Sequence, residues 1–148
     1  MYERKYDFKA RGKQRPRATR NGRMYTPKQT VEFEKMVAMG WGYPRLSKEI
    51  KAEVDVYVKI PASFTKGKRL AAEHNIIRPT TTPDIDNILK AIFDGLNGVA
   101  YEDDKQIVEV VANKYYSDKN YFVVRVEELE EIFINRESDT QDDKEVVR

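Results

Sequence analysis

The sequence predicts a single α+β domain in which a mainly antiparallel β-sheet is packed by two principal α-helices. A chain of 148 residues with 40% hydrophobic content is suited to one globular core. Apolar residues alternate along Ile50–Ile60 as in a half-buried strand, and they recur at helical spacing along Ile85–Leu96. Each of these elements has one apolar face, so a two-layer packing is expected. We expect the domain to span residues 1–130 and an acidic, disordered tail to follow at 131–148.

The N-terminal third is predicted to contain a strand, a long loop and a helix. Lys5–Ala10 alternates between apolar and polar side chains and predicts a strand. Arg11–Tyr25 is polar, basic and long, which is typical of a functional loop. Thr26 is a suitable N-cap with Pro27 at the first helical position, so a helix should run from there to the break at Gly40–Pro44.

The middle of the chain predicts one strand and two helices. In Ile50–Ile60 every second residue is apolar, which is the clearest strand pattern in the sequence. Lys66–Glu73 is expected to form a short helix. Ile85–Leu96 is expected to form an amphipathic helix that the run Gly95-Leu96-Asn97-Gly98 ends.

Two further strands are predicted after that helix, over Gln106–Tyr116 and Tyr121–Glu127. The polar segment Ser117–Asn120 between them reads as a tight turn. We therefore expect the two strands to pair as a β-hairpin, which adds to the antiparallel character of the sheet.

The composition excludes several kinds of site. The chain has no cysteine and a single histidine, His74, so it can form neither a disulfide framework nor a Cys/His zinc site nor a thiol nucleophile. No stretch approaches the roughly 18 apolar residues of a membrane span, and the N-terminus lacks the apolar core of a signal peptide. We expect a soluble, cytoplasmic protein with no membrane partner.

The charges are distributed unevenly along the chain although the formal net charge is only +2. Residues 1–30 contain ten basic and two acidic side chains, a net charge of +8. Residues 121–148 contain four basic and nine acidic side chains, a net charge of −5. A basic N-terminal segment and an acidic C-terminal tail on a near-neutral chain are typical of nucleic-acid binding. The alternative is an ordinary solvated basic loop.

Five acidic residues flank the helix predicted at Ile85–Leu96. Asp84 and Asp86 stand at its start, and Glu102, Asp103 and Asp104 follow the turn at its end. Two like charges about 5 Å apart repel by roughly 3 kcal/mol at an effective dielectric constant near 20, so such clusters usually hold a cation. Carboxylate oxygens suit a hard divalent metal, Mg²⁺ or Mn²⁺.

Each of these acids also has a purely structural interpretation. If Asp84 to Asp86 is extended, both carboxylates point the same way, about 6 to 7 Å apart, and face one site. Alternatively, either aspartate caps the helix and complements its dipole. Lys90 lies on the same helix face as Asp86 and Asp94, where it forms either a surface ion-pair ladder or a group that stabilises a phosphate.

Together these features predict a metal-dependent phosphodiester hydrolase, in which a bound metal activates water and no protein nucleophile is required. The segment PDIDNILKAIFDGLNGVAYEDDKQI resembles the signature of the RusA family of Holliday-junction resolvases. GKQRPRATRNGRMYTPKQTVEFE resembles the basic entry segment of phage-associated and Gram-positive members, and the similarity covers roughly residues 5 to 128. A bacterial or phage-encoded protein is implied.

The resemblance also implies particular site residues and an assembly. Metal-binding aspartates would be Asp84, Asp86 and Asp104, with Lys90 as the catalytic lysine. Asp103 stays open as an alternative ligand, because the turn before it is compact. The implied enzyme is a Mg²⁺-dependent homodimer that nicks opposing strands of a four-way DNA junction symmetrically. Each copy would meet the junction phosphates with basic side chains of its N-terminal loop: Lys13, Arg15, Arg17, Arg20 and Arg23.

Two other functions are compatible with the residues alone. The chain could be a nucleic-acid-binding module without catalysis, in which Tyr25, Trp41 and Tyr43 stack on bases. Packing of these aromatic side chains around the Gly40–Pro44 turn is the simpler expectation. A nuclease for flaps or other branched DNA would keep the same site and differ only in substrate.

Overall fold

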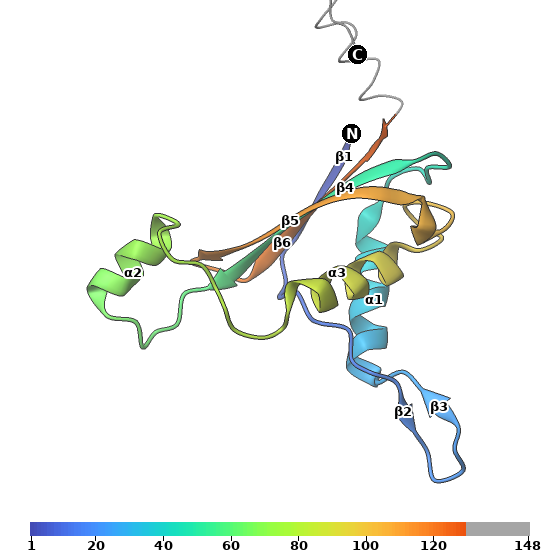
Figure 1. The fold of residues 1–148 in the computed structure, drawn as a ribbon, viewed down its shortest axis with the longest axis horizontal. Helices are drawn as coiled ribbons and strands as arrows, with labels where there is room; N and C mark the ends of the chain where they lie inside the picture. Colours follow the sequence, from blue (N-terminus) through green and yellow to red (C-terminus); the bar gives the residue numbers. More distant parts are fainter. Residues whose placement is uncertain (130–148) are drawn as a thin grey trace, which may run out of the picture.

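The computed structural model describes residues 1–129, so the predicted acidic tail at 131–148 lies outside the described residues. These residues form a single small α+β domain with a four-stranded mixed sheet and three α-helices (Figure 1). Within residues 1–129, no helix is long and apolar enough to cross a bilayer. The sheet order is β1-β6-β4-β5. Its strands are β1 (Tyr2–Tyr6), β4 (Ile50–Lys59), β5 (Ile107–Ser117) and β6 (Tyr121–Glu128).

The sheet is mixed, with two antiparallel pairings and one parallel pairing. Strand β6 pairs antiparallel with both β1 and β4, whereas β5 pairs parallel with β4. The predicted hairpin between the last two strands is wrong, because β4 lies between them. Ile50, Ala52 and Val54 of β4 are fully buried, and a strand with such an apolar face is stabilised most at the centre of a sheet.

The turn that was expected to close the hairpin instead crosses the end of β4. The Ile60 backbone N–H donates to the Ser117 carbonyl at 2.9 Å, and the Lys59 backbone N–H donates to Asn120 Oδ1 at 2.8 Å. The polar segment therefore reverses the chain as predicted. It places β6 two strand positions away from β5, because β4 fills the gap between them.

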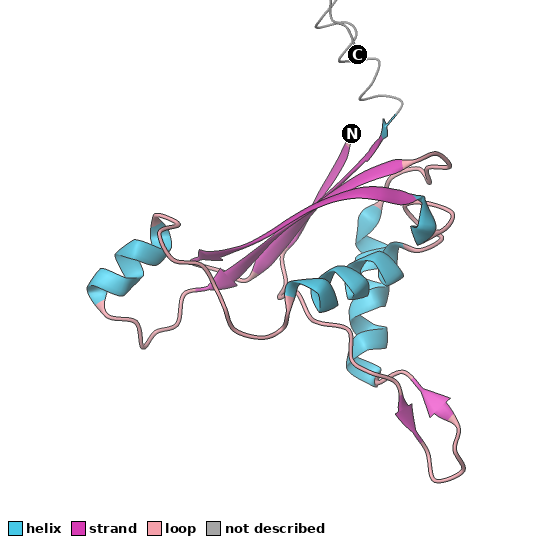
Figure 2. Ribbon diagram, viewed as in Figure 1, coloured by secondary structure: helices cyan, strands magenta, loops and turns pink. Residues whose placement is uncertain are grey.

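Helices α1 (Lys28–Trp41) and α3 (Ile85–Leu96) pack against each other and lie on one side of the sheet (Figures 1 and 2). The helices approach closely at Gly95, where an added Cβ would lie 3.0 Å from the backbone oxygen of Glu34. Pro27 occupies the N-cap position of α1, one residue later than predicted. The helix runs past Gly40 and ends at Gly42, whose φ of 71° is left-handed.

The hydrophobic core lies between this helix layer and the sheet. Trp41, Ile92 and Phe122 are fully buried there, and Tyr6 stacks on Phe122 with ring centroids 4.8 Å apart. The first strand is β1, earlier than the predicted Lys5–Ala10, because its backbone pairs with β6 over Tyr2–Tyr6. The packed core fixes α3 relative to the strands that flank it.

Two parts of the chain project from this body (Figures 1 and 2). One is a small hairpin of β2 (Arg17–Ala18) and β3 (Met24–Tyr25), which lies inside the long loop predicted from sequence. The other contains α2 (Lys66–Glu73), where the predicted short helix is confirmed. A 3₁₀ turn, η1 (Asp104–Gln106), leads into β5.

Candidate active site

The start of α3 is held in place by contacts from distant parts of the chain. Lys114 Nζ, on β5, donates to the backbone carbonyls of Thr81 at 2.7 Å and Pro83 at 3.0 Å. From the N-terminal segment, the Lys13 backbone N–H donates to the Asn87 carbonyl at 3.0 Å. Gly12 approaches so closely that a Cβ there would lie 2.8 Å from Pro83 Cβ. The first turn of α3 is therefore positioned by both β5 and the N-terminal segment.

Asp84 and Asp86 are exposed on this anchored turn. Asp84 is the N-cap residue with extended backbone, and Asp86 is already helical, so the alternative in which Asp84 to Asp86 is all extended is wrong. The Asp84 side chain makes no capping hydrogen bond. Within residues 1–129 neither carboxylate has an ion-pair partner, so both remain available at the positive end of the helix dipole.

Lys90 and Asp94 continue this helix face as a charged ladder. The Lys90 ammonium lies 3.8 Å from Asp94, and Lys13 Nζ lies 3.1 Å from the same carboxylate. Lys13 also pairs with Glu34 of α1. Burial by itself lowers the pKa of Lys13, but hydrogen bonds and charge interactions with both carboxylates outweigh it and raise that pKa. Lys13 therefore links α1 to α3.

Asp103 and Asp104, in the turn after α3, lie near Lys90 and Asp94. The buried Tyr101 hydroxyl donates to the Phe93 carbonyl at 2.7 Å, which holds this turn against the helix. Asp103 forms a capping box, since its Oδ1 accepts from the Lys105 N–H at 2.9 Å and its own N–H donates to Gln106 Oε1 at 2.8 Å. Asp103 thus shapes the turn that presents Asp104.

The two neighbouring carboxyls have pKa values shifted in opposite directions. The Lys105 backbone N–H that donates to Asp103 lowers the pKa of that carboxyl. Desolvation raises the pKa of Asp104, and the negative charges of Asp103 and Asp94 raise it further, while Lys90 opposes them. The turn η1 contacts α3, and Asp104 is close enough to Lys90 and Asp94 to feel both charges, so Asp104 lies beside the second half of α3.

The predicted metal ligands are therefore spread along the length of α3, with Asp84 and Asp86 at its start and Asp104, in η1, beside its second half. Within residues 1–129, no three acidic or histidine side chains are gathered closely enough to hold a metal ion as they stand. Asp86 and Asp94 are eight residues apart, about 12 Å along the axis at 1.5 Å per residue. The donor chemistry nevertheless fits a hard divalent cation, because Asp84 and Asp86 offer carboxylate oxygens without a competing basic partner.

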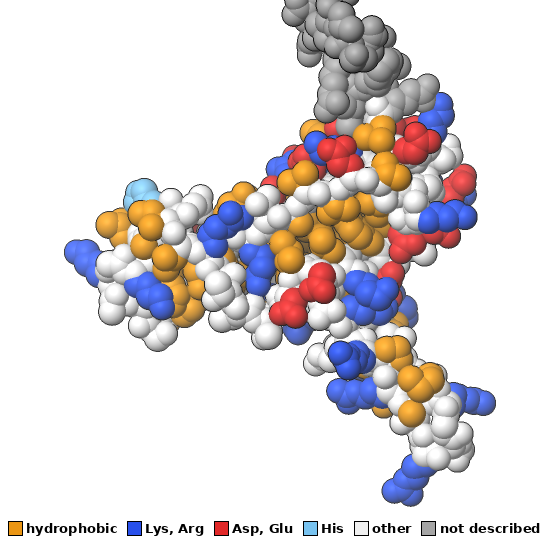
Figure 3. All heavy atoms as spheres, viewed as in Figure 1, with side chains coloured by type: hydrophobic (Ala, Val, Ile, Leu, Met, Phe, Trp, Pro, Cys, Tyr) orange, Lys and Arg blue, Asp and Glu red, His pale blue; other side chains and the backbone are white. Residues whose placement is uncertain are grey.

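The basic arm, which we define as residues 15–25, extends away from the body beside this face (Figure 3). Its short strands pair at two positions, and Gly22, with a φ of 78°, allows the turn at its tip. Met24 and Tyr25 are exposed on the arm. Four arginines are exposed without an ion-pair partner in the described part of the chain: Arg15, Arg17, Arg20 and Arg23.

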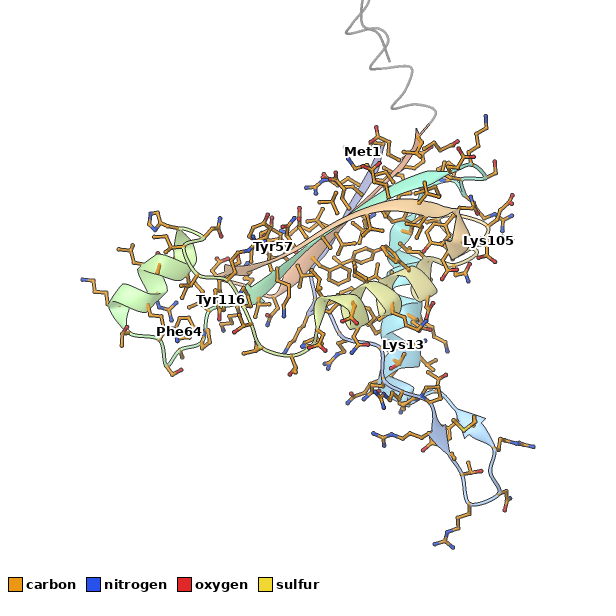
Figure 4. All side chains as sticks on the ribbon, in the orientation of Figure 1. Met1, Lys13, Tyr57, Phe64, Lys105 and Tyr116 are labelled. Atoms are coloured by element: carbon orange, nitrogen blue, oxygen red, sulfur yellow. The ribbon has the colours of Figure 1, made fainter. Side chains whose placement is uncertain are left out.

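Lys13, the fifth residue predicted to contact DNA, differs from these arginines. It lies at the base of the arm, close to α3 (Figure 4), and only 18% of its side chain is exposed. Its ammonium is paired with Asp94 and Glu34 inside the protein. The contact of Lys13 with DNA therefore remains a prediction, whereas its packing role is visible in the structure.

A cleft of about 290 Å³ lies between the base of the arm and the start of α3. Lys9 and Arg11 bring positive charge to its lining, and Thr82 and Pro83, immediately before Asp84, form part of its wall. Its other lining residues are Ala10, Gly12, Gln14, Gln29 and Thr30. The cleft therefore lies between the segment that leads into the basic arm and the segment that leads into Asp84.

Several residues that build this region were not identified from sequence. Lys114 occupies a core-facing position of β5, opposite Val56. A lysine at an apolar position of that strand could have indicated from the sequence that it has a structural role. No sequence pattern could have identified Glu34, because its ion pair with Lys13 depends on how α1 crosses α3. Of the three aromatic residues considered for base stacking, Trp41 is fully buried and Tyr43 stacks on Tyr2, which confirms packing for these two.

Two comparisons with known proteins bear on this arrangement. The family model described as "Endodeoxyribonuclease RusA" matches residues 7–127, which includes the basic arm, α3 and the acidic turn. A protein of Bacillus subtilis (strain 168), "Uncharacterized protein YqaN", is 34% identical over 124 residues, covering 78% of this chain and 87% of the relative. The match extends over nearly all the described residues and confirms the resemblance seen in the sequence. The chain therefore belongs to the RusA family of endodeoxyribonucleases, the Holliday-junction resolvases.

Proposed function

We propose that this protein is a Mg²⁺-dependent, structure-selective endodeoxyribonuclease that resolves four-way DNA junctions by paired symmetrical nicks as a homodimer. The observation that carries the proposal is the pair of exposed aspartates, Asp84 and Asp86, beside a cleft with basic lining and a basic arm. Family membership supplies the nuclease class and the junction as substrate. The metal, the symmetry of cutting and the residue roles are part of the proposal.

The proposed role of each site residue follows from where it lies. Asp84 and Asp86 would hold Mg²⁺, or Mn²⁺ in its place, and Asp104, which lies beside the second half of α3, would join them as a ligand only after moving toward them. A bound metal would stabilise negative charge on the phosphate and activate water for attack. Lys90, about one helical turn from Asp86, would neutralise a phosphate oxygen as its charge increases. Asp103, engaged in its capping box, is better suited to shaping the turn than to binding metal.

The four arm arginines would bind the DNA backbone. Phosphate contacts position DNA without reading its sequence, which suits an enzyme that recognises a branch. A junction concentrates negatively charged phosphates at its centre, so the two basic arms of a homodimer would both bind there. The cleft lined by Lys9 and Arg11 gives a strand a path from the arm to Asp84.

The test is cleavage of a labelled synthetic four-way junction, beside a matched duplex and a flap, with Mg²⁺ and with EDTA. We expect paired cuts across the junction by the wild type with Mg²⁺ only, and no cuts by Asp86→Asn. The matched control is Asp118→Asn, which makes the same change at an exposed residue of the β5–β6 turn and should cut normally.

Other outcomes would change the assignment in distinct ways. Preferential cutting of the flap would keep the metal site and replace the substrate. Junction binding without cutting under any metal or pH would favour a binding module. Normal cutting by Asp86→Asn would remove that residue from the site.

A further inference from the structure

The segment between β4 and α3 forms a projection to which the proposed function gives no role. We define the α2 lobe as residues 61–81, which contain α2 and the chain on either side of it. Figure 1 places this lobe and the basic arm on different sides of the domain, with the start of α3 between them. The exposed Asp84 and Asp86 therefore stand between two projections.

The α2 lobe is fixed to the sheet by specific contacts with β5. Phe64 packs edge-on against Tyr116, with ring centroids 5.5 Å apart, and Figure 4 shows these two side chains together. Arg78 Nε donates to the Lys114 carbonyl at 2.8 Å, and the Arg78 guanidinium lies 4.3 Å from the ring centroid of Tyr115. The lobe is therefore held in a defined position on the domain.

Lys114 connects the lobe to the start of α3. Its carbonyl accepts the hydrogen bond from Arg78 of the lobe, while its ammonium donates to the carbonyls of Thr81 and Pro83. Arg78 precedes Asp84 by six residues, so their Cα atoms are at most about 20 Å apart at roughly 3.3 Å per residue. That distance is about six base pairs of a DNA duplex at 3.4 Å each. A duplex that is cut at Asp84 therefore extends far enough to contact the lobe.

The α2 lobe is basic, and its helix cations lack acidic partners. Residues 61–81 contain four basic side chains and one acidic side chain, a net charge of +3. Lys66 and Lys68 are exposed, and neither they nor Arg69 form an ion pair within residues 1–129. Figure 3 shows basic side chains on this projection. Such a surface is complementary in charge to the phosphates of DNA.

Two of these cations are held in place by the residues just before α2. Lys68 Nζ lies 4.2 Å from the ring centroid of Phe64, and the Arg69 guanidinium donates to the Pro61 carbonyl at 3.2 Å. Both cations keep further N–H groups that can bind an anion. Because the side chains are already positioned, binding of a phosphate costs less conformational entropy.

The first turn of α2 carries charges that oppose helix stability. The N-terminus of a helix is the positive end of its dipole, so basic side chains there are unfavourable. Lys66 is nevertheless the first helical residue and Lys68 the third. The N-cap Thr65 Oγ1 accepts from the Lys68 N–H at 3.2 Å, so glutamate or glutamine at position 68 would complete a capping box. Residues that act against local stability in this way are expected at functional surfaces.

We propose that the α2 lobe binds the phosphate backbone of a duplex arm of the DNA substrate through Lys66, Lys68 and Arg69. The lobe and the basic arm then hold the DNA on both sides of the exposed aspartates. Phosphate contacts require neither a particular sequence nor a branch, so the lobe also binds linear duplex DNA. This inference deepens the proposed function and rests on its assignment of DNA as the substrate.

The lobe also exposes two apolar side chains, which are typical of a protein contact. Leu70 is exposed by 56% and Ile76 by 76%. Two side chains fall short of the large apolar patch that usually marks such a contact, whereas the three cations are unpaired. The charge therefore favours DNA, and Leu70→Ser separates the two kinds of partner.

Anisotropy of a labelled four-way junction and of a linear duplex, in EDTA at several salt concentrations, tests the proposal. Full-length Lys66→Gln with Lys68→Gln removes two positive charges and supplies the glutamine of a capping box, so its urea midpoint should equal or exceed that of the wild type. We expect its affinity for both DNAs to fall at least about tenfold at low salt. The slope of log affinity against log salt should become shallower by about two, at roughly 0.9 per lost phosphate contact.

Two variants provide the controls. Lys35→Glu makes the same change in net charge at an exposed residue of α1, and it should leave affinity and slope unchanged. Leu70→Ser removes an exposed apolar side chain from the lobe itself and should also bind DNA as the wild type does.

The outcomes separate this inference from the proposed function. Unchanged affinity and slope in the double-glutamine variant would overturn the inference, and paired cuts by that variant would leave the proposed function standing. Equal losses in Lys35→Glu would attribute the effect to net charge and would also overturn it, as would weakened binding by Leu70→Ser alone. A loss confined to the double-glutamine variant would support the lobe contact even if the wild type cut no DNA, and the nuclease assignment alone would then fail.

Discussion

Asp84 and Asp86 stand at the start of a helix whose inner side is fully buried, whereas the basic arm is a two-stranded hairpin with exposed Met24 and Tyr25. The aspartates are anchored through Lys114 and Lys13, which hold the backbone on either side of them. The arm has few tertiary contacts of its own.

This difference corresponds to the two tasks that we propose. Metal ligands and catalytic groups must be held to a fraction of an ångström, so they belong on packed elements. Phosphate contacts act through charge, which falls off slowly with distance and tolerates variation in position. Substitutions in the two regions should therefore produce separable defects.

The largest effect is expected from Asp84→Asn. Metal stabilisation of a phosphoryl transition state is worth several kcal/mol, so junction cleavage should fall about 10³-fold. Folding should be retained, because Asp84 makes no capping hydrogen bond that asparagine could lose. Junction affinity in EDTA, measured by fluorescence anisotropy, should match or exceed that of the wild type. A parallel loss of binding and cleavage would contradict the separation of tasks.

Charge reversal in the arm should produce the complementary defect. Arg15→Glu with Arg17→Glu should weaken junction binding about a hundredfold at low salt, since a charge-assisted contact contributes about 1.5 kcal/mol and 1.4 kcal/mol is tenfold. The slope of log affinity against log salt should become shallower by about two, at roughly 0.9 per lost phosphate contact. Lys119→Glu, in the β5–β6 turn, provides the control. An unchanged slope would show that the arm is not the phosphate contact.

Lys13 lies where the two regions meet, and its replacement should reduce stability. Lys13→Met would leave Glu34 and Asp94 without their shared cation, which we expect to lower the free energy of unfolding by about 1–3 kcal/mol. Lys28→Met removes the exposed pair of Lys28 with Glu32 and should cost less than about 1 kcal/mol. Urea unfolding of both variants measures the difference, and equal stabilities would show that Lys13 is not a structural link.

The smallest effect concerns the pH dependence of the metal-free protein. The raised pKa of Asp104 means that the folded chain holds this proton more tightly than the unfolded chain. Stability from this group therefore increases as pH falls through the raised pKa, and at neutral pH its negative charge is slightly destabilising. In EDTA at pH 7, the free energy of unfolding of Asp104→Asn should equal that of the wild type or exceed it by up to about 0.5 kcal/mol. This difference in stability should disappear near pH 4, where Asp104 is largely protonated in the wild type.

If Asp104 is a metal ligand, Mg²⁺ should make the wild type more stable than Asp104→Asn. The melting temperature of the wild type should rise with Mg²⁺ concentration, as expected when a ligand binds only the folded state. Asp104→Asn should respond less. Equal responses of both proteins would argue against metal binding by Asp104.

Much of this molecule is determined by local pattern. The alternation in Ile50–Ile60 and the helical spacing in Ile85–Leu96 predicted β4 and α3 nearly to the residue. Lys66–Glu73 was also predicted correctly as a helix. Such periodicities are local, because they record which side of one element meets the core.

Sheet order and side-chain partners were decided only by the tertiary structure. The reversal at Ser117–Asn120 was visible in the sequence, yet a local turn cannot show that β4 lies between β5 and β6. From the sequence, Lys13 was indistinguishable from the other basic residues of the loop. In the structure it forms ion pairs with Glu34 and Asp94, because α1 and α3 cross beside it. Pairings between residues far apart in sequence depend on how all the apolar faces pack at once, and no single segment contains that information.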